Sequence, residues 1–129
     1  LLGRRRIGLS LVLVDDAGMR RLHLRYLGKD RPTDVLAFGQ GDAEFFPKSK
    51  IPFLGDVVVS TTTARRMATR FGKRWDEELL LYICHGVLHL MGYRDATTRQ
   101  KAKMDRKQQE ILRKVLGPQW PFRKQKPLF

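Results

Sequence analysis

The segment HGVLHLMGYRD, residues 85–95, contains two histidines four residues apart and an aspartate that follows a glycine. On a helix, side chains four residues apart lie on one face with Cβ atoms about 5–6 Å apart, so His85 and His89 can bind one ion. Gly92 can turn the chain with a positive φ and bring Asp95 toward them as a third ligand. Two imidazoles and a carboxylate are a typical zinc set, so the segment predicts a metal site.

Two other interpretations of these residues remain open. A helix as apolar as this one can hold neutral histidines that are hydrogen-bonded in the core. Asp95 can also cap a helix that begins near Ala96. The glycine and the carboxylate in register with the histidines favour the metal interpretation.

The spacing H-x-x-x-H-x-x-G-x-x-D equals that of the metzincin proteases, with Asp in place of their last His. Those proteases carry a Glu directly after the first His as general base. Gly86 occupies that position here, so a peptidase is disfavoured. Cys84 lies about 100° around the helix from His85, so we do not expect it to be a ligand.

The composition indicates one globular domain with an anionic partner. The chain has 129 residues, and Lys and Arg outnumber Asp and Glu by 26 to 13, which gives a formal net charge of +13. Such a charge favours nucleic acid as the partner. The longest apolar run, LLLYIC, is too short to span a membrane, and no signal-peptide pattern opens the chain, so we expect a cytoplasmic protein or one inside an organelle. The single cysteine excludes an internal disulfide.

Strands and helices alternate along the predicted domain. The apolar run IGLSLVLVDD predicts a strand in the middle of a sheet, followed by a helix that Asp15 or Asp16 caps and Gly28 ends. The segments DVLAF and LGDVVVS predict two further strands. The long connection GQGDAEFFPKSKIPF between them carries three phenylalanines, which we expect to pack on the core rather than to stack on bases.

Three helices follow, and the last of them has a basic face. The first ends at Gly72, the second runs from Asp76 to Gly92, and the third runs from about Thr98 to Leu116. The third has an apolar stripe of Met104, Ile111, Leu112 and Val115 and a basic remainder suited to an anion. Residues 117–129 form a basic tail that we expect to be irregular.

Three blocks of the sequence resemble the YbeY family of metal-dependent endoribonucleases. Residues 85–93 match the family pattern H-G-x-L-H-L-x-G-Y-D-H as far as its tyrosine, and YLGKDRPTDVLAF and LGDVVVS resemble two further family motifs. Met104, Gln108, Glu110, Ile111 and Leu112 fall where the last helix of the family has the same residue types.

The resemblance implies an α+β fold, with a small mixed β-sheet, packed helices and the metal-binding helix buried at the centre. We expect residues 1–129 to form one such domain that lacks the amino-terminal strand and helix of the family. The implied function is a single-strand-specific endoribonuclease in ribosomal RNA processing, with one Zn²⁺ per chain, or another divalent metal, held by His85, His89 and Asp95. The implied partners are ribosomal RNA and the small ribosomal subunit.

The sequence departs from the family pattern at positions that bear on activity. The third ligand is Asp95 instead of His, and Arg94 replaces an Asp. Leu27 replaces an Arg implicated in catalysis, and the last helix opens with basic rather than acidic residues. Lys29 and then Arg31 are the predicted substitute phosphate contacts. The alternative function is a ribosome-assembly factor of the same fold that binds RNA with weakened catalysis.

Overall fold

The computed structural model describes residues 7–39 and 53–120, which form three strands and four helices. In chain order these are β1 (Gly8–Val14), α1 (Asp16–Leu27), β2 (Val35–Gly39), β3 (Phe53–Ser60), α2 (Thr61–Phe71), α3 (Trp75–Leu90) and α4 (Thr98–Leu116). The strands form a sheet in the order β1-β3-β2. β1 pairs with β3 in parallel and β2 pairs with β3 in antiparallel orientation, so the sheet is mixed.

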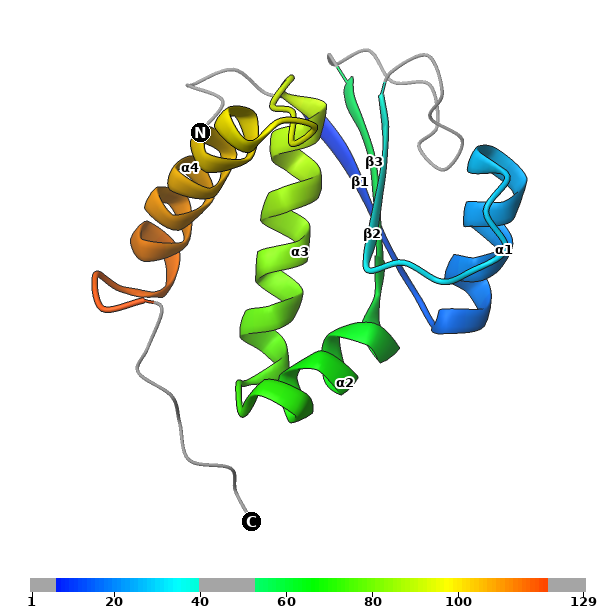
Figure 1. Cartoon of the computed structure of the whole chain (residues 1–129), viewed down its shortest axis with the longest axis horizontal. Coiled ribbons are helices and arrows are strands. Elements are labelled where there is room, and N and C mark those ends of the chain that lie inside the picture. Colours follow the sequence, from blue (N-terminus) through cyan, green and yellow to red (C-terminus); the bar gives the residue numbers. More distant parts are fainter. Residues whose placement is uncertain (1–6, 40–52, 121–129) are drawn as a thin grey trace.

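Successive residues of the central strand β3 point to opposite faces of the sheet, and each face has its own helical cover. Val58 packs with Met19 of α1 on one face, whereas Val57 and Val59 pack with Tyr82 of α3 on the other. Helix α4 packs on the side of α3 away from the sheet (Figure 1). Helix α3 therefore lies between the sheet and α4, which confirms the predicted α+β architecture with its central helix.

Local capping interactions set most helix ends where the sequence predicts them. The Asp15 carboxylate accepts a hydrogen bond from the backbone N–H of Gly18 at 2.7 Å and caps α1. Gly28 ends the same helix in the left-handed conformation, with φ of 68°. Helix α3 begins at Trp75, one residue before the predicted start at Asp76. Asp76 lies in the first turn of the helix, where its carboxylate accepts a hydrogen bond from the backbone N–H of Glu77 at 2.9 Å.

The prediction that β1 lies in the middle of the sheet is wrong for the described part of the chain. β1 is an edge strand there, and Leu9, Leu11 and Leu13 are 36%, 45% and 52% exposed. Val12 and Val14 point to the other face and pack on the cluster beneath α1. Helix α3 packs mainly over β2 and β3, so the leucine side of β1 stays largely uncovered.

Two further predictions concern side chains around this framework. Met104, Ile111 and Leu112 of α4 are buried as predicted, but Val115 is 63% exposed because it lies near the end of α4, beyond the contact with α3. The predicted packing of Phe45 and Phe46 falls outside the described residues, as do residues 121–129 of the tail. Among the residues that the structure describes, every helix is too short or too polar to cross a lipid bilayer.

Candidate metal centre

The end of α3 brings three potential ligand atoms together. Nε2 of His85 lies 3.0 Å from Nε2 of His89. Oδ2 of Asp95 lies 3.6 Å from the first of these nitrogens and 3.4 Å from the second. The structure therefore brings together the two histidines and the aspartate that the sequence predicts as a metal set.

A short turn after α3 carries Asp95 back toward the histidines. The backbone N–H of Tyr93 donates to the carbonyl of Leu88 at 3.0 Å and closes the end of the helix. Gly92 has φ of 100°, a conformation that side-chain-bearing residues rarely adopt, and it supplies the change of direction. The glycine is thus required by the turn that places the carboxylate.

Asp95 is not the cap of the following helix. The N-cap of α4 is Thr97, whose hydroxyl accepts from the N–H of Gln100 at 3.1 Å. The side-chain oxygen of Gln100 in turn accepts from the N–H of Thr97 at 3.2 Å, which completes a capping box. Because Thr97 caps α4, the carboxylate of Asp95 is not needed as a cap and faces the imidazoles instead. This favours the interpretation of Asp95 as a metal ligand.

Each imidazole is oriented by an acceptor at its other nitrogen. Nδ1 of His85 lies 3.2 Å from the amide oxygen of Gln108 on α4, and Nδ1 of His89 lies 3.0 Å from the carbonyl oxygen of Tyr93. A neutral imidazole that donates from Nδ1 presents an unprotonated Nε2, so the hydrogen-bond network selects the tautomer that binds metals. Gln108 thus orients His85 from α4, a role that its position in the sequence did not predict.

The three ligand atoms fit a metal ion in both charge and geometry. Two nitrogen lone pairs and a carboxylate oxygen face one another, and a cation between them relieves their repulsion. A circle through the three atoms has a radius of about 1.9 Å, close to zinc–nitrogen and zinc–oxygen bond lengths of about 2.0–2.2 Å, so His85, His89 and Asp95 are spaced to hold one ion. The side chains are 29%, 29% and 46% exposed, which leaves access for water or substrate.

Gly86 points away from this centre and into the sheet. A Cβ at this position would lie 2.6 Å from Cγ1 of Val57 and 3.0 Å from Cγ2 of Val35. A glutamate at residue 86 would therefore meet the sheet rather than the ligand atoms. The protease arrangement is incompatible with this packing, as well as missing from the sequence.

Cys84 is directed away from the ligands as expected. It packs against the buried cluster of Leu88, Met104 and Ile111 between α3 and α4. Burial raises the pKa of its thiol to about 11, so the neutral thiol prevails at neutral pH and is a poor ligand.

Lys29 and Arg31 lie in the connection from α1 to β2. The N–H of Lys29 donates to the carbonyl of His23 at 3.3 Å, and the carbonyl of Arg31 lies 2.8 Å from Nδ1 of the same histidine. This holds the turn against α1, on the sheet face opposite α3 (Figure 1). Within the described residues no hydrogen bond or ion pair joins Lys29 or Arg31 to His85 or His89, and their role as phosphate contacts stays a prediction.

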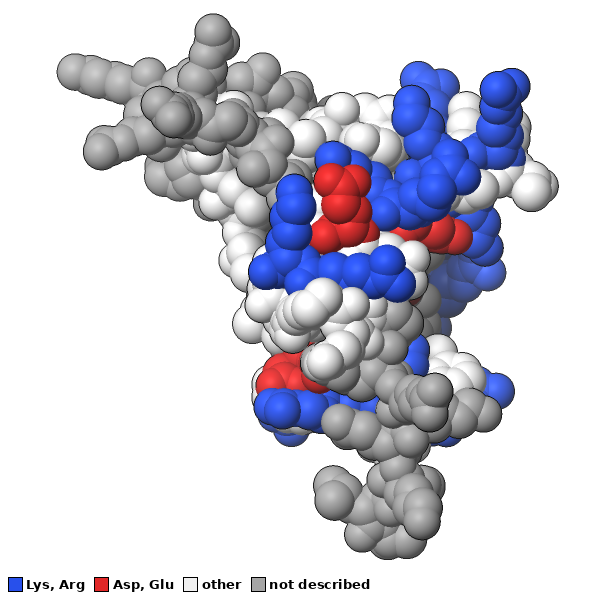
Figure 2. All heavy atoms as spheres, turned by 90° about the vertical axis from the view of Figure 1, so that its left-hand side faces the viewer, with Lys and Arg blue, Asp and Glu red and all other residues white. Residues whose placement is uncertain are grey.

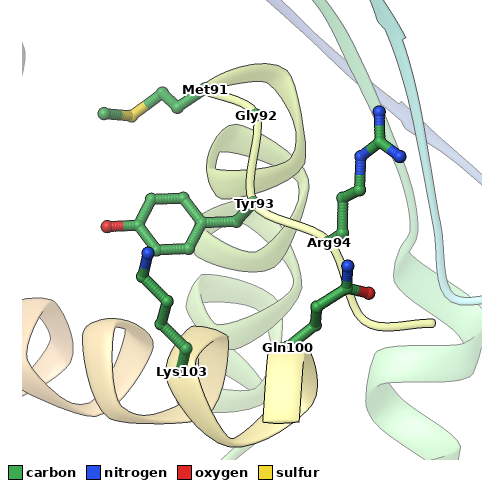
Figure 3. Close-up of a pocket in the computed structure, with 6 residues that line it drawn as sticks. All are labelled: Met91, Gly92, Tyr93, Arg94, Gln100 and Lys103. Carbon is green, nitrogen blue, oxygen red and sulfur yellow. The ribbon is translucent and has the colours of Figure 1, made fainter. Parts of the chain in front are cut away.

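Other cations lie closer to the metal set. Lys and Arg side chains gather on the side of the molecule that carries α4, with fewer acids among them (Figure 2). A pocket of about 430 Å³ opens beside the turn after α3, lined by Met91, Gly92, Tyr93, Arg94, Gln100 and Lys103 (Figure 3). Sequence reasoning noted Arg94 as a departure and Lys103 as part of a basic face, but only the fold unites them in one pocket.

Comparisons with known proteins find one family for this chain. The family model described as Endoribonuclease YbeY matches residues 3–116. Proteins named Endoribonuclease YbeY from Frankia casuarinae and Bacillus cytotoxicus are 41% and 37% identical over 110 and 109 residues, in each case 81% of this chain. The matched regions are 55% and 70% of those proteins, so the chain spans little more than half of the Frankia relative.

The fold has a counterpart among solved structures. The solution structure of TM1509 from Thermotoga maritima superimposes with a TM-score of 0.61 and 26% identity, covering 90% of this chain and 72% of that one. The family match includes α3, the turn at Gly92 and α4, which together build the candidate metal centre. By sequence and by fold, this chain belongs to the YbeY family.

Proposed function

We propose that the chain is a zinc-dependent endoribonuclease that hydrolyses phosphodiester bonds in single-stranded RNA during ribosomal RNA maturation. The proposal extends to the small ribosomal subunit as partner and to the cytoplasm or an organelle interior as the place of action. The activity is the one named for the relatives of this chain. The net charge of +13 supports a polyanionic substrate.

The observation that carries the proposal is the convergence of Nε2 of His85 and Nε2 of His89 with the carboxylate of Asp95. Three protein ligands with an accessible side are the pattern of a catalytic rather than a structural zinc site. Zinc in such a site supplies Lewis-acid polarisation of a phosphoryl oxygen and a water of lowered pKa.

The residues around the ligands have definable tasks. Gln108 and the carbonyl of Tyr93 keep the imidazoles in the orientation and tautomer that bind metal. Asp95 brings a negative charge that a third histidine would lack. The ion held here therefore keeps a formal charge of +1 instead of +2, which makes it a weaker Lewis acid than in a three-histidine site.

A second candidate is an RNA-binding assembly factor of the same fold with weakened cleavage. Its support is Leu27, which is 54% exposed and stands where the family pattern has an arginine. Leucine cannot donate hydrogen bonds to a phosphate, and the loss of one such donor in an active site typically costs about 3–4 kcal/mol of transition-state stabilisation. The two candidates predict the same RNA affinity and different cleavage.

Metal analysis followed by cleavage assays tests the proposal. The purified protein is expected to contain one zinc, or another divalent metal, per chain and to cut unstructured RNA in a chelator-sensitive way, with little cleavage of duplex RNA. Asp95→Asn is expected to lose metal and activity. Asp105→Asn is the matched control, because it removes an exposed carboxylate outside the metal set and is expected to keep both.

The possible outcomes separate the candidates. Bound metal with RNA affinity but no cleavage supports the assembly factor. Equal metal content and cleavage in the Asp95→Asn and Asp105→Asn variants would refute the assigned centre. Contacts with about four phosphates give a slope near −3 for log affinity against log salt on a single strand, and a slope near zero would argue against a polyanionic substrate.

A further inference from the structure

The pocket beside the turn after α3 shares a residue with the metal centre. The carbonyl oxygen of Tyr93 accepts the hydrogen bond from His89, while its ring lines the pocket (Figure 3). The next residues are Arg94, which lines the pocket, and Asp95, which belongs to the metal set. The pocket and the metal set are therefore built from adjacent residues of one turn.

The side chains around the pocket offer donors and positive charge. Arg94 and Lys103 carry full positive charges, and none of the six lining residues is acidic. The amide oxygen of Gln100 is occupied, because it accepts from the N–H groups of Ala96 and Thr97 at 3.2 Å each. Its NH₂ group makes no hydrogen bond to the described residues and remains available as a donor.

The two cations are not neutralised within the described part of the chain. Neither Arg94 nor Lys103 forms an ion pair with any described residue, and the ammonium of Lys103 lies 6.0 Å from the ring centroid of Tyr93. Asp105, two residues beyond Lys103 on α4, is turned by about 200° around the helix and faces elsewhere. The pocket therefore keeps an unbalanced positive charge, which favours an anion over a neutral ligand.

The size and shape of the pocket narrow the choice of anion. About 430 Å³ is more than a free phosphate needs and lies within the range of pockets that hold small organic molecules. Figure 3 shows Tyr93 and Lys103 on one side, with Arg94 and Gln100 on the other. An aromatic ring beside two cations suits a unit with a planar base and a phosphate, since bases stack on aromatic side chains and phosphates pair with Arg and Lys.

We propose that this pocket binds one nucleotide of the RNA strand adjacent to the nucleotide held at the metal set. Arg94 and the NH₂ group of Gln100 hold its phosphate, and the ring of Tyr93 with the ammonium of Lys103 forms the opposite wall against its base. The identification of the polyanion as RNA rests on the proposed function. The pocket positions the strand and takes no part in breaking the bond.

Binding measurements on paired double variants test this proposal. The pocket variant is Arg94→Ala with Lys103→Ala. The matched control is Arg99→Ala with Lys101→Ala, which removes the same charge from residues of α4 that do not line the pocket. Affinity for a fluorescent 2′-O-methyl RNA strand is measured by anisotropy against salt concentration on the protein as purified. A gel checks that the strand stays intact, and thermal melting checks that the variants fold.

The expected effect follows from the release of counterions. Each lost phosphate contact reduces the steepness of the log–log salt dependence by about 0.7 on a single strand, so the pocket variant, which loses the contact with one phosphate, is expected to lose about 0.7. If all proteins bind alike near 1 M salt, this corresponds to about 5-fold weaker binding near 0.1 M. The control variant is expected to lose clearly less than the pocket variant.

Three results are decisive. Equal losses in the two double variants, or no loss in the pocket variant, would overturn the proposal and leave only a diffuse positive face. Competition by inorganic phosphate or a nucleoside monophosphate as strong as by the strand would also overturn it, because the pocket would then bind a free anion. The measurement needs no cleavage of RNA. A larger loss of affinity in the pocket variant, in a protein that shows no nuclease activity, would therefore support the nucleotide pocket and refute the proposed function.

Discussion

Gly86 lets α3 lie close against the sheet, and an alanine there tests whether the central helix is held by this packing. The added Cβ would lie 2.6 Å from Cγ1 of Val57, which is fully buried. Ordinary contacts between such carbons are about 3.5–4.0 Å, so α3 would have to move away from the sheet by several tenths of an ångström or more.

Two opposing effects determine the magnitude. Alanine is favoured over glycine inside a helix by about 1 kcal/mol, whereas overpacking of a well-packed core costs about 1–3 kcal/mol. Steric overlap wins at 2.6 Å, so Gly86→Ala is expected to lower the free energy of unfolding by about 1–2 kcal/mol. In a Val57→Ala background the methyl groups of Val57 are gone and only Cγ2 of Val35 remains close, at 3.0 Å, so the same change is expected to be close to neutral or slightly stabilising.

Urea denaturation of the four proteins of this cycle measures the coupling. We expect the two substitutions together to cost about 2 kcal/mol less than the sum of their separate costs. Ala102→Gly, on the exposed face of α4, measures the helix-propensity effect without overlap and is expected to cost up to about 1 kcal/mol. Additivity of Gly86→Ala and Val57→Ala within about 0.5 kcal/mol would refute the close approach.

Three other substitutions have defined outcomes. Asp95→His is expected to speed RNA hydrolysis and to shift its pH–rate profile toward lower pH, since a neutral third ligand leaves more charge on the ion; identical rates and profiles would contradict this. Gln108→Leu removes the acceptor 3.2 Å from Nδ1 of His85 and is expected to weaken zinc binding by about 10–100-fold, measured in competition with a chelating dye. An unchanged zinc affinity would show that Gln108 does not orient His85. The hydrogen bond from Thr63 holds the pKa of Asp16 below its usual value, so its carboxylate stabilises the fold fully at neutral pH and loses this effect as the pH falls through its folded-state pKa. The difference in urea midpoint between wild type and Asp16→Asn is therefore expected to shrink below about pH 4, and a difference that persists in acid would contradict the assignment.

Features that depend on neighbouring residues could be predicted from the sequence. The four-residue spacing of His85 and His89, the turn at Gly92 and the cap at Asp15 arise from hydrogen bonds and dihedral preferences that span only a few residues. Such interactions are the same in an isolated segment as in the folded chain. They were enough to predict the metal set, most helix ends and the family.

Features that depend on contacts between distant segments were missed or wrong. Gln108 lies 23 residues from the histidine that it orients, and no spacing rule links the two. The apolar run of β1 is compatible with a central or an edge strand, and the choice depends on where α3 packs. The phosphate contacts of Lys29 and Arg31 stay a prediction, because their turn packs against α1 and no local rule fixes its distance from α3.

The sequence by itself determined the ligand types, their helical register and the excess of positive charge on this protein. Only the tertiary structure decided that α3 lies between the sheet and α4, that Gly86 faces β3, and that Arg94 and Lys103 share a pocket beside the ligands. The physical reason is the range of the interactions. Backbone geometry acts over one or two helical turns, whereas the burial of apolar surface brings together any segments whose faces fit, whatever their separation along the chain.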